Sequence, residues 1–488
     1  MHTIGPPRTW QRRSILLWVW LISSLTSAAL ALPLRAQDSQ LGDSHLWSKR
    51  FGSTFDDYGY AVAVDGNGDV LLTGSFQGTV NFGGANLTSA GSFDVFVAKY
   101  SGADGAHLWS KRFGSSGGNS ELGWAVAVDG SDDVLITGIF GGTVNFGGGN
   151  LTSAGLEDIF VAKYSGADGA HLWSKRFGST GSDRGRGVAV DGNGDVLLTG
   201  AFLLTVNFGG GNLSSAGNFD IVVAKFSGTD GTHLWSRRFG GTGGDEGLGV
   251  AVDGSGNPSV TGTLRGAADL GGGNTALIGV VDMFVAKYSG TDGAHLWSKR
   301  FGSTSNQVFG NAVAVDSSND VLVTGDLFGT VNFGGGILSS AGSFDIVVAK
   351  FSGADGAHFW SRRYGSTSQD NAFAVAVDSG GGVLASGDFV GTVNFGGDNL
   401  TSAGLNDIFV AKYSGADGSH LWSKRFGSSS SDNGYGVAVD GSRNAVVTGT
   451  FSGAVDFGGG ELISAGNADI FVVKFGASAR RRGQLISD

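Results

Sequence analysis

Carboxylic acids recur at one place in this chain, a few residues ahead of a short apolar segment that reads Val-Ala-Val or nearly so. Five residues before the first Val of this segment, six of seven copies carry an acid and the seventh carries Val308; the acids are Asp57, Glu121, Asp183, Asp245, Asp370 and Asp432. Carboxylates can act as general acids or bases, or accept hydrogen bonds from a ligand. Alternatively, they can hold loop N–H groups and touch no ligand.

Two residues before the same Val, the residue type changes from copy to copy in an otherwise nearly constant sequence. These variable positions are Tyr60, Trp124, Arg186, Leu248, Asn311, Phe373 and Tyr435. Variation inside a repetitive frame marks side chains that packing does not fix. Aromatic rings beside acids suit a sugar or a cationic group. The sequence therefore leaves two interpretations. The acids and most of the variable residues line a ligand-binding mouth, or, as the repetition favours, the acids bond loop N–H groups and the variable residues are surface residues without a function.

Two further sets of residues could bind metal. Asp65-Gly66-Asn67-Gly68-Asp69 resembles the start of a calcium loop, but other copies lose these ligands and no Glu follows at the twelfth position. A hairpin turn uses the same residue types, so we expect turns, with calcium as the alternative. Single His residues precede each recurrent Trp and cannot converge on one ion, so we expect no metal site there; they are His45, His107, His171, His233, His295, His358 and His420.

The elements that must position these residues follow from a long repeat. The segment His-Leu-Trp-Ser-Lys-Arg-Phe-Gly occurs seven times with small changes, and its Trp residues lie 62 to 64 residues apart. A period of this size indicates a repeat architecture. In the first repeat, apolar runs bounded by Gly, Asn and Asp predict strands over 60–65, 69–76, 94–100 and 107–113.

Four antiparallel strands repeated seven times predict an all-β fold, a seven-bladed β-propeller of four-stranded antiparallel blades. A β-solenoid is the alternative. The first Trp strand lacks preceding partners and the last repeat ends after its third strand, so we expect the N-terminal strand to complete the last blade and close the ring.

Residue size and charge predict how each blade is oriented. The small Val-Ala-Val strand should lie innermost and the Trp strand outermost, where its Lys-Arg pair would discourage edge-to-edge pairing. Each Trp should pack between neighbouring blades. The long connections between second and third strands, which carry Asn81 and its equivalents, should cover the same face as the acids.

Taken in order, Val-Ala-Val-Asp, Asp-Val-Leu-Leu-Thr-Gly-Ser-Phe, Asp-Val-Phe-Val-Ala-Lys-Tyr and Leu-Trp-Ser-Lys-Arg-Phe-Gly resemble the bacterial seven-bladed β-propeller repeat family, the SBBP repeats. This resemblance implies a bacterial secreted or surface protein and brings no catalytic residues with it. A second resemblance is to the Trp-docking motif of quinoprotein propellers, on Ala98 and Trp109, although Tyr100 stands where that motif has Asp. It implies shared blade packing and no quinone.

Composition and the chain ends restrict the setting. The chain has no Cys, which excludes disulfides and thiolate chemistry. Basic and then apolar residues predict a signal peptide over 1–36, with an uncleaved anchor as the alternative; the propeller then covers 37–476 and a basic tail 477–488. Without the four Arg of residues 1–36, the formal charge falls from −11 to about −15, which opposes nucleic-acid or anionic-membrane binding.

These observations predict a non-enzymatic module, secreted or at the cell surface (the periplasm is an alternative), that binds a glycan or a protein at the channel mouth. We expect a monomer without a cofactor and without membrane insertion after cleavage. The alternative is an extracellular carbohydrate-active hydrolase or lyase that uses acids of the mouth, with Asp183 beside Arg184 and Arg186 as the clearest break in symmetry. A scaffold without a small ligand is a third reading.

Overall fold

Each repeat folds into strands because short apolar runs, rich in Val, Ile and Phe, alternate with turns of Gly, Asp and Asn. The structure, a computed structural model, describes residues 44–276, 278–304 and 306–477. The predicted signal peptide and the tail beyond residue 477 lie outside the described residues. Within the described part, no helix has the length and apolar character needed to cross a membrane.

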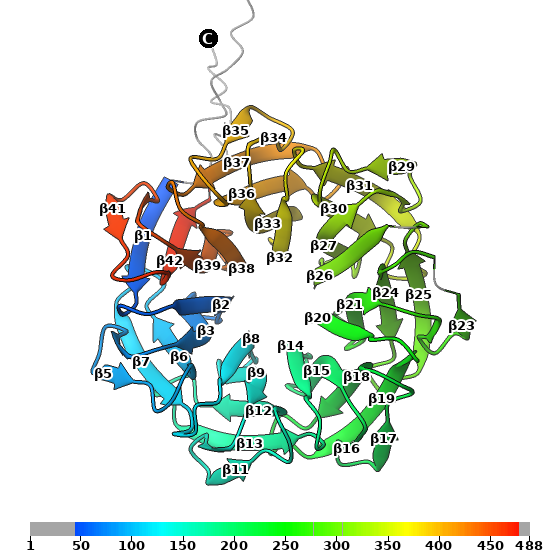
Figure 1. Cartoon of the computed structure of the whole chain (residues 1–488), viewed down its shortest axis with the longest axis horizontal. Coiled ribbons are helices and arrows are strands. Elements are labelled where there is room, and N and C mark those ends of the chain that lie inside the picture. Colours follow the sequence, from blue (N-terminus) through cyan, green and yellow to red (C-terminus); the bar gives the residue numbers. More distant parts are fainter. Residues whose placement is uncertain (1–43, 277, 305, 478–488) are drawn as a thin grey trace, which may run out of the picture. The chain divides into compact units, whose positions relative to one another are not determined.

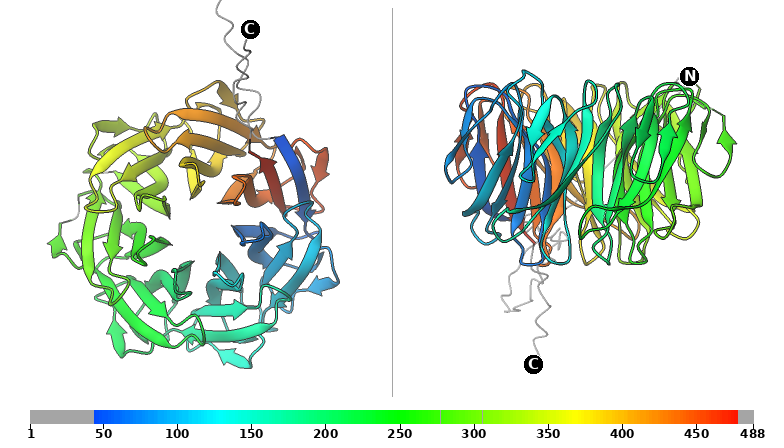
Figure 2. Two further views of the ribbon diagram at one scale, coloured as in Figure 1. Left: turned by 180° about the vertical axis from the view of Figure 1, so that it is seen from behind. Right: turned by 90° about the horizontal axis from the view of Figure 1, so that it is seen from below.

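Seven antiparallel blades of four main strands each are arranged around a common axis as in a propeller (Figure 1). The sheet of blade 3 extends to six strands, because its outer strand also pairs with a hairpin from blade 4. In every blade the four main strands pair in the order first, second, third, fourth, with the first strand nearest the axis and the Trp strand at the perimeter (Figure 2). The predicted fold class and the predicted orientation of the blades are confirmed.

The strands of blades 1 to 7 occupy equivalent positions in each repeat. The inner strands are β2 (Asp57–Val64), β8 (Leu122–Val128), β14 (Arg184–Val190), β20 (Glu246–Val252), β26 (Gln307–Val315), β32 (Asn371–Val377) and β38 (Asn433–Val439). The second strands are β3 (Val70–Phe76), β9 (Val134–Phe140), β15 (Val196–Phe202), β21 (Pro258–Leu264), β27 (Val321–Phe328), β33 (Gly382–Phe389) and β39 (Ala445–Phe451).

The outer half of each blade is equally regular. The third strands are β6 (Asp94–Tyr100), β12 (Asp158–Tyr164), β18 (Asp220–Phe226), β24 (Asp282–Tyr288), β30 (Asp345–Phe351), β36 (Asp407–Ser414) and β42 (Asp469–Gly476). The outer strands of blades 1 to 6 are β7 (His107–Phe113), β13 (His171–Phe177), β19 (His233–Gly241), β25 (His295–Phe301), β31 (His358–Tyr364) and β37 (His420–Phe426), and blade 7 uses β1 (Ser44–Phe51).

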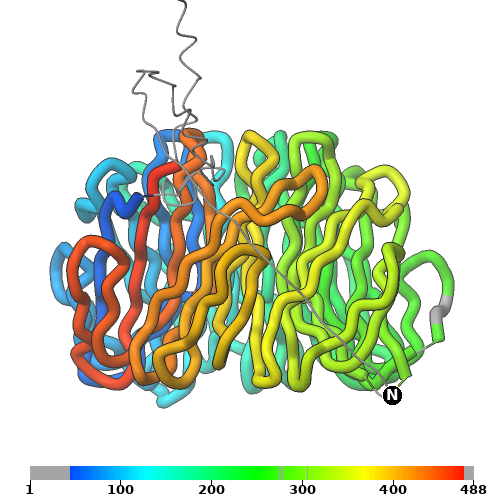
Figure 3. The backbone as a smooth tube through the Cα atoms, turned by 90° about the horizontal axis from the view of Figure 1, so that it is seen from above, coloured from blue at the N-terminus to red at the C-terminus, as the bar shows by residue number. Residues whose placement is uncertain are grey.

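The two ends of the described chain close the ring. Strand β1 pairs antiparallel with β42, from Ser44 opposite Gly476 to Phe51 opposite Ile470. Figure 3 shows these blue and red segments side by side. The predicted closure is confirmed: blade 7 takes three strands from one end of the chain and its outer strand from the other.

The long connections form hairpins that the sequence did not predict, and their predicted location was wrong. They lie at the perimeter, outside the blades (Figure 1), as β4 (Thr79–Asn81) with β5 (Asn86–Thr88), β10 (Thr143–Asn145) with β11 (Asn150–Thr152), β16 (Thr205–Asn207) with β17 (Asn212–Ser214), β22 (Ala268–Asp269) with β23 (Asn274–Thr275), β28 (Thr330–Asn332) with β29 (Ile337–Ser339), β34 (Thr392–Asn394) with β35 (Asn399–Thr401), and β40 (Ala454–Asp456) with β41 (Glu461–Ile463). Burial of an aromatic ring explains this position, because the ring centroid of Phe82 lies 5.6 Å from that of Phe51 and 4.4 Å from that of Phe96.

The apolar core is divided into seven clusters, each shared by two neighbouring blades. One cluster joins Trp109 and Phe113 of blade 1 with Val134 and Phe160 of blade 2. The Trp109 indole N–H donates to the carbonyl oxygen of Gly166, on the next blade, at 3.1 Å. The prediction that the Trp side chains pack between blades is therefore confirmed. The indole N–H donates across the boundary in Trp47, Trp109, Trp173, Trp235, Trp297 and Trp360.

Candidate functional site

The variable residue of each repeat lies at a β-bulge of the inner strand. In blade 1 the pairing register shifts between Gly59 and Ala61, which leaves Tyr60 as the extra residue. The same shift flanks the variable residue in blades 2 to 6, and the shift in blade 7 lies between Asn433 and Gly436. A bulge re-aims a side chain out of the regular alternation. We call the seven residues the axial belt: Tyr60, Trp124, Arg186, Leu248, Asn311, Phe373 and Tyr435.

A close approach between blades favours the bulge. A Cβ atom added at Gly59 would lie 2.6 Å from the hydroxyl oxygen of Thr448 on blade 7. The equivalent Cβ at Gly123 would lie 2.6 Å from the hydroxyl oxygen of Thr73. Only small residues fit before the bulge, so the next side chain is the first that can leave the interface between two blades.

One arc of the belt is aromatic and spans contiguous blades. The ring centroids of Phe373 and Tyr435 are 5.2 Å apart, and those of Tyr435 and Tyr60 are 5.8 Å apart. Tyr58, the second residue of β2, stacks on Tyr60 with centroids 5.6 Å apart. All four side chains are partly exposed. Burial raises the pKa of Tyr435 to about 12, so this hydroxyl stays protonated at neutral pH.

The belt continues into a charged sector on blades 2 to 4. The guanidinium of Arg186 lies 3.9 Å from the ring centroid of Trp124. Glu246, the first residue of β20, accepts from Arg184 at 2.9 Å and from Arg186 at 3.5 Å. The belt position of blade 4 itself carries the apolar Leu248. Charge is therefore concentrated in one sector of an otherwise aromatic and neutral ring.

Blades 5 and 6 carry two buried carboxylates that the sequence reading missed. The Asn311 amide donates to Asp326 at 2.7 Å and to the Ala372 carbonyl oxygen at 2.9 Å. Asp388 accepts from Asn371 at 2.8 Å and from Asn406 at 2.7 Å. Burial raises the pKa of Asp326 to about 7 and that of Asp388 to about 6.

A signal for these two acids is visible in the sequence. They follow the Gly of the second-strand motif, where the other blades carry Ser75, Ile139, Ala201, Thr263 and Thr450. A carboxylate inside such an apolar run is costly unless it is bonded, which makes it a marker of a special site. Comparing the repeats at this position as well would have found both residues.

The six acids ahead of the inner strands are completely buried and are held by loop amides. Asp57 accepts from the Ser53 N–H at 2.6 Å and from the Gln77 N–H at 3.0 Å. Asp183, Asp245, Asp370 and Asp432 make the equivalent pair of backbone hydrogen bonds. Each of these carboxylates thus joins the loop that enters its blade to the loop after the second strand.

The remaining acid and the exceptional Val fit the same pattern. Glu121 accepts from the backbone N–H of Ser115 at 3.2 Å and from its hydroxyl at 2.8 Å. Val308 is also fully buried, within the apolar cluster between blades 4 and 5. Burial raises the pKa of Asp57 and Asp370 to about 6 and of Glu121 to about 7, and it raises the pKa of Asp183, Asp245 and Asp432 as well. The structure brings neighbouring belt residues into contact and buries the acids in the loops.

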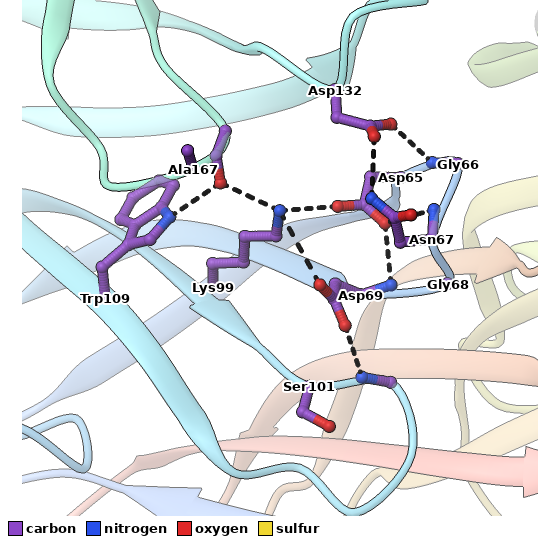
Figure 4. A network of polar contacts seen from close by, with 12 residues as sticks. Asp65, Gly66, Asn67, Gly68, Asp69, Lys99, Ser101, Trp109, Asp132 and Ala167 are labelled. Atoms are coloured by element: carbon purple, nitrogen blue, oxygen red, sulfur yellow. Dashed lines mark hydrogen bonds and ion pairs between the residues drawn. The ribbon is translucent and has the colours of Figure 1, made fainter.

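The calcium-like loops hold an ammonium group (Figure 4). The Lys99 ammonium lies 2.7 Å from Asp65 and donates to the Gly166 carbonyl oxygen at 2.9 Å. The other Asp65 oxygen accepts from the backbone N–H groups of Asn67 and Asp69. The lysine, which is 5 % exposed, thus occupies the position that a cation would take, and it links two blades.

The recurrent His residues lie on the outer strands, remote from the axial belt (Figure 1). His107 bonds the hydroxyl of Ser110 on its own strand at 3.1 Å, and its pKa is lowered by burial. Among the described residues, no three His, Cys, Asp or Glu side chains are grouped so that they could hold a metal ion.

Comparison with known proteins supports the repeat assignment. Residues 46–75 and 296–326 match a family model described as a β-propeller repeat, SBBP. A curated relative, the uncharacterized WD repeat-containing protein L264 of Acanthamoeba polyphaga mimivirus, is 25% identical over 461 residues and 75% of this chain. The chain spans about a third (32%) of the length of that relative.

The chain is similar to solved structures only at a low level. The quinohemoprotein alcohol dehydrogenase of Comamonas testosteroni is 12% identical, with 92% of this chain and 79% of that chain covered and a TM-score of 0.44. The WD40 propeller domain of Doa1 is 9% identical, with 88% and 97% covered and a TM-score of 0.43. Likeness at this level says nothing about activity. The seven blades show that this chain is a β-propeller repeat protein, and its residues 46–75 and 296–326 are similar to the SBBP repeat.

Proposed function

We propose that the protein is a non-enzymatic binding module that holds a glycan at the axial belt. The aromatic arc carries this proposal, because Phe373, Tyr435, Tyr60 and Trp124 come from four contiguous blades and are all partly exposed. An aromatic ring offers an apolar face and a polar edge or hydroxyl, which suits a sugar ring with its apolar C–H face and hydroxyl rim.

Polar groups complete the requirements of such a site. Binding sites combine apolar and aromatic walls with a few placed polar groups that fix orientation. These groups are the Asn311 amide and Arg186 in the belt, and Arg184 beside it on blade 3. A sugar on the arc would therefore meet arginine donors on one side. On the other side it would meet the amide oxygen of Asn311 as an acceptor, because the Asn311 N–H groups already donate to Asp326 and Ala372.

The position of the six predicted acids favours binding over hydrolysis. A general acid or base must come within hydrogen-bond reach of the substrate. Asp57 and its equivalents are buried and already accept from the backbone, so they offer no exposed carboxylate to a substrate at the belt. The alternative of a carbohydrate-active hydrolase or lyase would require these loops to open.

The setting of the protein is part of the same proposal. A basic and then apolar N-terminal segment supports export to the cell surface or the medium. An acidic surface would keep such a protein soluble. It would also repel anionic polymers, except where a local cationic group binds them.

A thermal-shift screen tests the proposal. The protein without residues 1–36 is melted with a panel of plant, bacterial and animal oligosaccharides, because a ligand that binds only the folded state raises the midpoint. A ligand at a hundred times its Kd stabilises by about 2.7 kcal/mol. We expect Trp124→Ala and Tyr435→Ala to abolish the shift for any oligosaccharide that produces one.

A matched control separates the belt from the general surface. Phe359 on the outer strand β31 is 53% exposed, so Phe359→Ala removes an aromatic ring at the perimeter and should leave the shift unchanged. A shift that survives both belt variants, or that disappears with Phe359→Ala, would place the ligand elsewhere and contradict the proposal.

A further inference from the structure

Blade 3 differs from the six others at the axis. The first position of the inner strand in blade 3 is Arg184, and the bulge position is Arg186. In the other blades the bulge residue is aromatic, Leu or Asn, and the residue after the buried acid or Val308 is Tyr58, Leu122, Glu246, Phe309, Asn371 or Asn433. The repeat frame does not demand this pair of arginines, since six copies fold without it.

Aromatic rings hold both guanidinium groups in place. Arg186 lies 3.9 Å from the ring centroid of Trp124 on blade 2, and Arg184 lies 4.5 Å from that of Phe219 on its own blade. Stacking of this kind orients a guanidinium and leaves its donor-bearing edges free. The side chains are 29% and 25% exposed for Arg184 and Arg186, so solvent reaches both.

The hydrogen-bonding capacity of Arg186 is poorly used. A guanidinium carries five N–H donors. The Arg186 side chain makes one long contact, 3.5 Å to Glu246, and its Nε–H is buried without a hydrogen-bond partner. Arg184 makes the shorter contact to the same carboxylate, at 2.9 Å. The Glu246 carboxylate thus contacts both arginines, but only its contact with Arg184 is short.

We propose that the belt selects an acidic saccharide, whose carboxylate pairs with Arg186 beside Trp124 while its sugar rings pack on the aromatic arc. This inference rests on the glycan function proposed above. A planar carboxylate matches the planar fork of a guanidinium and can accept two hydrogen bonds from it. The ligand carboxylate would take over the contact that Glu246 makes only weakly with Arg186.

Glu246 should oppose the binding of an acidic ligand, and the direction of this effect can be tested. In the free protein Glu246 competes with the ligand for the arginines, as an internal anion at 21% exposure. Removal of its charge should therefore strengthen binding of an acidic ligand, whereas removal of a residue that helps to hold the ligand would weaken it.

The experiment compares matched probes by isothermal titration. The probes are a set of uronate-containing oligosaccharides, the carboxyl-reduced neutral form of each, and a sulfated form of each neutral chain. We expect the uronates to bind at least tenfold more tightly than their reduced forms, with an affinity that falls as salt is added. Equal binding of acidic and neutral forms overturns this inference and leaves the glycan function standing.

Two other outcomes also decide the matter. If no oligosaccharide of any class binds, the glycan function itself fails together with this inference. If only the sulfated chains bind, the site recognises a tetrahedral anion and the carboxylate assignment is overturned.

Variants of the charged sector complete the test. Arg186→Gln should weaken uronate binding at least tenfold and weaken binding of the reduced form far less, so that the preference for the uronate is lost, and Arg186→Lys should restore only part of that preference because the planar fork is missing. Glu246→Gln should strengthen uronate binding several-fold. Unchanged or weaker binding by Glu246→Gln overturns the competition.

A distant arginine provides the control. Arg443 lies in the exposed turn between β38 and β39, at the opposite end of the blade from the start of the inner strand. Arg443→Gln removes the same charge and should leave uronate binding unchanged. A loss equal to that of Arg186→Gln would assign the effect to net charge and contradict a specific site.

Discussion

The interfaces between the blades and the axial belt come from the same repeat, but they vary in opposite ways. Every outer strand carries a Trp, and each of the described third strands carries a Lys that pairs with an Asp of the turn after the inner strand. The belt holds six residue types in seven positions. A side chain that is buried between two blades is fixed by both, whereas a bulge side chain contacts its neighbours from a partly exposed position, where several residue types fit.

Loss of one interface Trp should have the largest effect on stability. Trp109 is 6% exposed and bonds the neighbouring blade, so Trp109→Ala should lower the free energy of unfolding by about 3–5 kcal/mol. Trp124→Ala in the belt should cost clearly less, because that ring is already partly in water. Urea unfolding of the two variants measures both values, and equal losses would erase the distinction between the two regions.

Breaking a buried ion pair should come next. Lys99→Met leaves the Asp65 carboxylate uncompensated, which typically costs about 3–5 kcal/mol. The double variant Lys99→Met/Asp65→Asn removes the stranded charge and keeps an oxygen for the loop amides, so it should recover part of the loss. Thermal and urea unfolding would show this; additive losses in the double variant would mean that the pair is not coupled.

The buried acid beside the belt should make stability depend on pH. The pKa of Asp326 is raised by burial to about 7 from an ordinary value of 3.8, so folding takes up a proton between these values. The corresponding stability is fully present below the lower value and is lost as pH rises through about 7. Asp326→Asn should remove this dependence. Between pH 5 and pH 8, the free energy of unfolding should therefore fall by roughly 2–3 kcal/mol less in this variant than in the unmodified protein.

The control for this pH effect is an exposed aspartate. The pKa of Asp104 is lowered by the backbone N–H of Ala106, so it titrates below this pH window. Asp104→Asn should therefore follow the unmodified protein between pH 5 and pH 8. If the difference in unfolding free energy between Asp326→Asn and the unmodified protein does not change with pH, Asp326 is ionised throughout the range.

The smallest effect is expected for an exchange within the belt. Leu248→Asn places at blade 4 the residue that blade 5 already uses, and a partly exposed position should tolerate it within about 0.5 kcal/mol. Val260→Asn, which puts the same side chain at a fully buried interface position, should destabilise strongly. Comparable unfolding midpoints for the two variants would contradict the freedom assigned to the belt.

Much of the fold could be predicted because local and long-range signals agree. The strands Asp94–Tyr100 and His107–Phe113 begin and end where the sequence predicted, since turns of Asp and Gly bound both. The hairpin at Thr79–Asn81 was missed because three-residue strands give no periodic signal. Its outer position depends on where the Phe82 ring can be buried, which is a property of the assembled blades.

The candidate site was predictable in part. Variation between copies identified the belt residues, because the frame around them barely changes. The acids were placed at the same mouth from their spacing alone. In the structure, the carboxylates of Asp57 and its equivalents point into the loops and accept hydrogen bonds mainly from backbone N–H groups. Asp326 and Asp388 went unnoticed although their sequence context is as unusual.

The sequence by itself determined the number of blades, the order of strands and the closure of the ring, because a fixed period and two incomplete ends admit few arrangements. Only the tertiary structure decided which polar residues face the axis. The bulge after Gly59 and its equivalents directs the variable side chain toward the axis, and the close approach of neighbouring blades favours that bulge. The carboxylates of the buried acids accept hydrogen bonds from loop amides and are not exposed to solvent.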